Sequence, residues 1–150
     1  MRILTSFKPF DAEFGPIQRA AVASWRRHSR AEITVLGDEE DGAVEAARDF
    51  GLSVVPTSRM RTARDLGLGY GAPLLTSVVE QAETRPDEVV VWLNSDLIFV
   101  HDVDGVFAHV FSTWPDPFMV GRRRNVRTVA DAVLGAGTLL IPTGADVFAW

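Results

Sequence analysis

One run of residues constrains the fold of this chain more than any other. Residues 88–93, Glu-Val-Val-Val-Trp-Leu, are almost continuously apolar and rich in β-branched side chains, and turn residues bound them. Such a run predicts a central strand of a parallel sheet, because a strand that helices cover on both faces presents no side to solvent.

The patterns around this run alternate between strand and helix. Further strands are predicted at residues 2–7, 32–37, 52–55, 118–121 and 138–141. Helices are predicted to begin at Gly15, after the acidic residues 38–41, at Pro73 and near Val103, because apolar side chains recur there at helical spacing. We therefore predict an α/β fold for residues 1–150, a single domain with a mostly parallel open sheet flanked by helices.

Composition narrows the classes of function. The chain has no cysteine, which excludes disulfide frameworks, thiolate metal sites and cysteine nucleophiles. A net charge of −5 is not typical of a protein that binds nucleic acid. Because no apolar run approaches the length of a transmembrane segment and no signal peptide is recognisable, we expect a cytoplasmic protein. Lys8 is the only lysine, beside fourteen arginines.

Polar residues that follow the central strand define the first candidate site, because ligands of open parallel sheets bind outside the carboxyl ends of the strands. Asn94 and Asp96 are two residues apart, so in extended geometry their side chains point the same way. One carboxylate and one amide hold Mg²⁺ or Mn²⁺ weakly, but a diphosphate from the substrate would complete the ligand shell. Asn94, Ser95 and Asp96 are equally typical of a turn that ends a strand.

These residues carry a resemblance to a known family. The segment VVVWLNSDLIFV, residues 89–100, is similar to the Asp-x-Asp segment of glycosyltransferases with the GT-A fold, in the variant with Asn at the first position. FMVGRRRNV, residues 118–126, and IPTGADVFAW, residues 141–150, also resemble downstream segments of a GT-A-like group. The resemblance implies a nucleotide-diphospho-sugar transferase fold and a metal-dependent transfer of sugar from a nucleoside-diphosphate sugar to an acceptor hydroxyl. The acceptor is unknown.

The resemblance also implies roles for single residues. Asp96 would ligate Mn²⁺ or Mg²⁺ bound to the diphosphate of the donor, and Asn94 would face the ribose or a metal-bound water. Gly144-Ala145-Asp146 matches a Gly-x-Asp segment near the acceptor, where Asp146 would be a general base.

Residues after the other strands complete the predicted site. By the same resemblance, Ser6, Phe7 and Asp38 would lie beside the nucleoside. Arg61 and Arg64 belong to a loop at the same edge of the sheet, and arginine forks bind diphosphates bidentately. The alternative for this loop is a solvated surface with scattered ion pairs.

Two other functions stay open. Asn94 and the position at which the chain ends favour a binding module that keeps the fold without turnover, or the N-terminal part of a longer protein. A nucleotidyltransferase also needs a metal–diphosphate site, but Phe7-Lys8-Pro9-Phe10 lacks the glycines of its usual loop. A second Asp-x-Asp, Asp102-Val103-Asp104, is predicted to cap the helix that follows it.

Overall fold

Strands and helices alternate along the chain as the sequence predicts. The computed structural model describes residues 1–69, 71–85, 88–121, 123–126, 128, 130–131, 137–139 and 146–150. Its elements are β1 (Arg2–Thr5), α1 (Gly15–His28), β2 (Glu32–Leu36), α2 (Ala43–Asp49), β3 (Ser53–Val55), η1 (Thr57–Arg59), η2 (Ala63–Leu66), α3 (Leu75–Glu83), β4 (Val90–Leu93), α4 (Asp104–Thr113), β5 (Met119–Gly121), β6 (Arg124–Asn125), β7 (Thr138–Leu139) and β8 (Val147–Ala149).

The main sheet has the strand order β3-β2-β1-β4-β8-β5. Strands β1 to β4 pair in parallel, whereas β8 enters antiparallel between β4 and β5. The α/β class with a mostly parallel sheet flanked by helices is thus confirmed. The strand predicted at 138–141 is confirmed only at β7, which pairs with β6 outside the main sheet, and residues 140–141 lie outside the described part.

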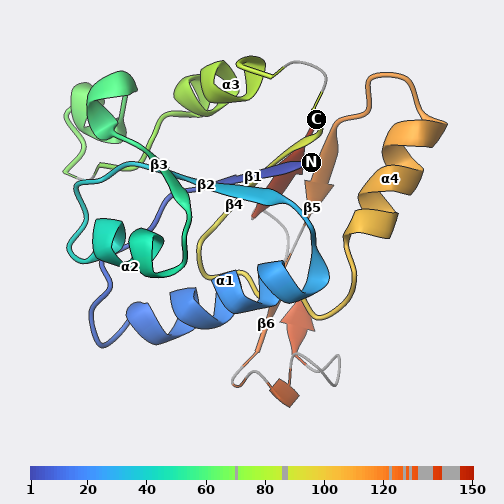
Figure 1. Cartoon of the computed structure of the whole chain (residues 1–150), viewed down its shortest axis with the longest axis horizontal. Helices are drawn as coiled ribbons and strands as arrows, with labels where there is room; N and C mark the ends of the chain where they lie inside the picture. The colour runs from blue at the N-terminus through green and yellow to red at the C-terminus, as the bar shows by residue number, and fades with distance from the viewer. Residues whose placement is uncertain are drawn as a thin grey trace.

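Helices cover both faces of the sheet (Figure 1), with α1 and α2 on one side and α3 on the other. The alternation of side chains along the strands explains the two resulting cores. Ile3 and Val91 pack in the cluster that holds residues of α1, α2 and α4, while Leu4 and Val90 pack with Val78 and Ala82 of α3. Continuous apolar strands are therefore needed in the middle of the sheet.

The peripheral helices differ from their predictions. The predicted apolar stripe of α3 is wrong at Leu75 and Val79, which are 57% and 36% exposed, because this short helix meets the sheet through Val78 and Ala82. The loop after β3 is not wholly irregular and contains the short helices η1 and η2. Among the described residues, no helix is long and apolar enough to cross a membrane.

Candidate functional site

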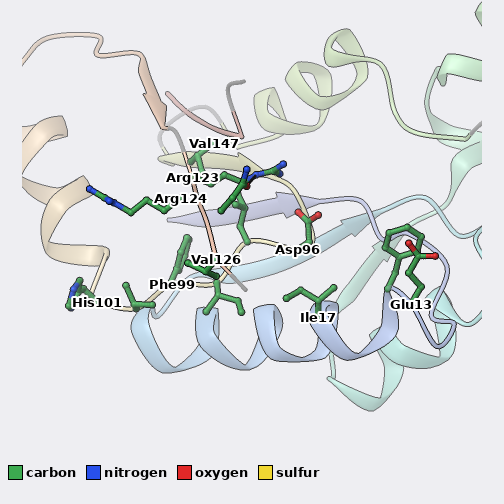
Figure 2. Close-up of a pocket in the computed structure, with 14 residues that line it drawn as sticks. Glu13, Ile17, Asp96, Phe99, His101, Arg123, Arg124, Val126 and Val147 are labelled. Carbon is green, nitrogen blue, oxygen red and sulfur yellow. Dashed lines mark hydrogen bonds between the residues drawn. The ribbon is translucent and has the colours of Figure 1, made fainter. Parts of the chain in front are cut away.

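A groove of about 870 Å³ opens beside α1, where the chain leaves β4 (Figure 2). This is the edge of the sheet at which the sequence predicts ligand binding. Its walls are mostly apolar, with charged side chains at intervals. The residues that line it are Glu13, Phe14, Ile17, Asp96, Leu97, Ile98, Phe99, Val100, His101, Arg123, Arg124, Asn125, Val126 and Val147.

Asp96 is the predicted site residue that lines this groove. Its partner is Lys8, whose Nζ donates a hydrogen bond to Oδ2 of Asp96 at 2.9 Å. The Lys8 and Asp96 side chains are 42% and 24% exposed, so the pair meets solvent and does not belong to the core. The other carboxylate oxygen, Oδ1, is buried and has no hydrogen-bond partner among the described residues.

The segment after β4 turns at once. The backbone N–H of Leu97 donates to the carbonyl of Asn94 at 3.2 Å, so the extended geometry that would align Asn94 with Asp96 does not continue. Their side chains accordingly have different partners, and the turn that the sequence left open as an alternative is confirmed. Buried Ser95 lies between them, and its hydroxyl has no hydrogen-bond partner in the described part of the chain.

Asn94 belongs to a second cluster, centred on the buried side chain of Asp146. Oδ1 of Asp146 accepts hydrogen bonds from Nδ2 of Asn94 at 3.1 Å and from an Nη of Arg123 at 3.0 Å. The backbone also joins them, since the N–H of Asn94 donates to the carbonyl of Asp146 at 3.3 Å. Arg123 thus links this cluster to the groove that it lines. Gly144 and Ala145, the rest of the predicted Gly-x-Asp segment, lie outside the described residues.

Gln18 fixes the loop that carries Lys8. Its side chain is fully buried on α1, and its amide binds the loop backbone with both ends. Oε1 accepts from the N–H of Lys8 at 2.8 Å, and Nε2 donates to the carbonyls of Lys8 and Pro9 at 3.0 and 3.3 Å. A buried amide needs such partners, and here they set the position of the backbone from which Lys8 reaches Asp96.

The two predicted nucleoside contacts after β1 lie outside the groove lining. Phe7 is buried in the core and makes an edge-on contact with Phe10, at 4.9 Å between ring centroids. Ser6 is half-buried beside it. Neither residue lines the groove. Their contacts with a nucleoside stay predictions.

The remaining predicted residues lie on the surface near β2 and η2. Asp38 accepts a hydrogen bond from the N–H of Thr57 at 2.9 Å, and this bond lowers the pKa of the Asp38 carboxyl. Arg64 forms an ion pair with Glu39, and Arg61 is exposed. None of these side chains lines the groove, and the loop has the solvated ion pair that the sequence left open as an alternative.

A divalent metal on Asp96 does not fit the described residues as they lie. Oδ2 of Asp96 is engaged by an ammonium group, and Oδ1 is closed off from solvent. Within the described part of the chain, no three acidic or histidine side chains are grouped so that they could hold a metal. Lys8 would have to leave before a metal entered. The Mn²⁺ or Mg²⁺ implied by the resemblance therefore stays a prediction.

Lys8 and Gln18 were missed as site residues by sequence reasoning. One signal was present, because Lys8 is the only lysine and follows the first strand almost directly. The sequence predicts that one of the three adjacent arginines 122–124 faces the ligand site, but it does not indicate which one, and both Arg123 and Arg124 line the groove.

No family model matches the sequence, and no curated protein matches it. The argument about function therefore rests on the residues of this chain.

Proposed function

We propose that the chain binds a nucleoside-diphosphate sugar in this groove and transfers the sugar to an acceptor hydroxyl. The observation that carries the proposal is the mixed lining of the groove, which contains apolar side chains such as Ile17 and Phe14 together with the charged side chains of Asp96 and Arg123. A nucleoside-diphosphate sugar has the matching composition, because its base is flat and largely apolar and its diphosphate is anionic. The resemblance of residues 89–100 to the GT-A segment supports the same substrate class.

The reaction forms one bond and breaks another at the anomeric carbon of the sugar. The acceptor oxygen bonds to that carbon, the bond to the diphosphate oxygen breaks, and the nucleoside diphosphate leaves with the electron pair. The acceptor proton passes to a base or to water. Cationic groups near the leaving diphosphate, such as Arg123, favour this step because negative charge develops there.

One observation favours binding without transfer as a second candidate. Asp146, the predicted general base, is buried and held by Arg123 and Asn94, and it does not line the groove. A base has to come within about 3 Å of the proton that it removes. A binding module of the same fold needs no such group. The role of Asp146 as a base stays a prediction.

The first experiment is a thermal-shift panel of UDP, GDP, CDP, ADP and dTDP, each with Mn²⁺ and with EDTA. A ligand at 100 times its Kd stabilises the folded state by about 2.7 kcal/mol. For a domain of this size we expect the midpoint to rise by about 5 °C or more. A panel without any shift would contradict the proposal. Hydrolysis of the matching sugar nucleotide then separates an enzyme from a binding module.

Substitution of Asp96 tests the location of the site. Asp96→Asn should weaken nucleotide binding about tenfold, because the carboxylate either holds a metal or fixes Lys8. Asp116→Asn is the matched control, since Asp116 is exposed on the connection between α4 and β5 and its positive φ is one that asparagine tolerates. Equal affinities for Asp96→Asn and wild type would place the ligand elsewhere.

A further inference from the structure

The Lys8 ammonium is a cation that the chain itself places at the groove. Lys8 and Asp96 are 88 positions apart in the sequence, and the loop after β1 brings Nζ to 2.9 Å from Oδ2. Nζ also lies 4.9 Å from the centroid of the Phe14 ring. Phe14 and Asp96 both line the groove, so the ammonium group adjoins two lining residues, while Lys8 itself is not part of the lining.

The ammonium group of Lys8 has N–H donors that Asp96 does not use. A lysine ammonium carries three N–H donors, and in the described structure one of them is used by Asp96. The side chain is 42% exposed, so the remaining donors have access to solvent beside Asp96. Phosphate oxygens can therefore be bound without breaking the pair with Asp96.

The position of Lys8 is prepared before any ligand arrives. Buried Gln18 binds the N–H and the carbonyl of Lys8, and Asp96 fixes the end of the side chain. A part-exposed ion pair adds little stability by itself. Its effect is to hold the charge in one place, which lowers the entropic cost of binding an anion.

Arg123, whose guanidinium also pairs with buried Asp146, is a second cation and lies on the groove lining (Figure 2), while Arg124 points away from Asp96. The acidic groups of the lining are Asp96, which is paired with Lys8, and Glu13. Two cations from separate segments suit a ligand that carries two linked phosphates, since each cation can form charge-assisted hydrogen bonds.

We propose that Lys8 binds the diphosphate of the ligand directly, at the place where the resemblance implies a metal, so that binding needs no divalent ion. This inference rests on the proposed function and specifies how its substrate is held. It also accounts for the poor fit of Asp96 to a metal, because the carboxylate serves to orient the ammonium.

The experiment measures the affinity for inorganic pyrophosphate and for the five nucleoside diphosphates by calorimetry, in EDTA and in Mn²⁺. Lys8→Gln should weaken binding in EDTA about tenfold or more, and Lys8→Arg should restore most of it, because charge-assisted hydrogen bonds are the strong ones. Arg85→Gln is the matched control, since it also removes a half-exposed cation from an ion pair, here with Glu32. Its affinity should equal that of the wild type.

The outcomes separate this inference from the proposed function. If nucleotides bind only with Mn²⁺ and Lys8→Gln is unchanged, the role of Lys8 is overturned and the proposed function stands. If pyrophosphate binds through Lys8 but no nucleotide binds, the proposed function is overturned and the role of Lys8 in binding a diphosphate stands. If neither binds to the wild type, both are overturned.

Acylation of Lys8 in the wild-type protein tests the same contact without any substitution, so the result does not depend on whether a variant folds. Lys8 is the only lysine, so an amine-selective reagent has one side-chain target, which peptide mass separates from the N-terminal amine. Pyrophosphate in EDTA should slow acylation of Lys8 by about tenfold at saturation, because the ammonium is then covered. An unchanged rate at saturating pyrophosphate would refute direct contact.

Discussion

Replacement of Gln18 by leucine should lower stability by about 3 kcal/mol. Leucine has a similar volume, so the change removes the amide with little loss of packing. Three hydrogen bonds to the loop backbone disappear, at 2.8, 3.0 and 3.3 Å. Each is worth about 1 kcal/mol net, and backbone groups left without partners beside a buried side chain add to the cost. The total is a large share of the stability of a typical domain.

Urea titration followed by tryptophan fluorescence measures this loss. The midpoint should fall with the slope m unchanged, because the surface exposed on unfolding stays the same. The melting temperature should fall by about 6–12 °C. Gln81→Leu is the control, because Gln81 is the only other glutamine and its side chain makes no hydrogen bond within the described part of the chain. If Gln18→Leu lowers the free energy of unfolding by less than about 0.5 kcal/mol, the range of ordinary surface substitutions, the hydrogen bonds of Gln18 do not stabilise the loop and the argument is refuted.

Two further predictions concern pH and backbone strain. The hydrogen bond from Thr57 lowers the pKa of Asp38, so this carboxylate stabilises the folded state above its ordinary pKa, about 3.9, and the contribution is lost as the pH falls through the lower folded value. Asp38→Asn should therefore flatten the fall of the urea midpoint below about pH 4, and an unchanged profile would contradict this. Gly42→Ala should cost about 1–2 kcal/mol in the same titration, because φ is +72° and the new Cβ would lie 3.1 Å from Cβ of Phe10. Gly69→Ala, with nothing within 4 Å of its Cβ, should change stability by less than about 0.5 kcal/mol, and equal losses at both glycines would refute the argument.

The central sheet could be predicted from the sequence because its signals are local. The run that forms β4 is apolar on both faces, and the structure covers it on both. Gly15 and Pro16 correctly predicted the start of α1. The acidic residue at the end of β4 was assigned to the ligand-binding edge by the same reasoning, and Asp96 lines the groove there.

The partners of the site residues could not be predicted, because tertiary contacts choose them. Lys8 reaches Asp96 over 88 positions, and Arg123 reaches Asp146 over 23. No periodicity links such pairs. The extended geometry expected for Asn94 and Asp96 was also wrong, since the hydrogen bond from the N–H of Leu97 to the carbonyl of Asn94 closes a turn there.

The place of β8 in the sheet has a consequence for how the chain assembles. Because β8 lies between β4 and β5, the earlier strand β5 cannot join the sheet until β8 has inserted. Until then the most apolar strand keeps an open edge, which is the geometry that invites pairing with another chain. Strand β8 can insert only after β4 is in place, because it pairs with β4 from Val91 to Leu93. The half of the sheet that adjoins Arg123 and Asp146 is therefore expected to form last during folding, after the half that contains β1 and β4.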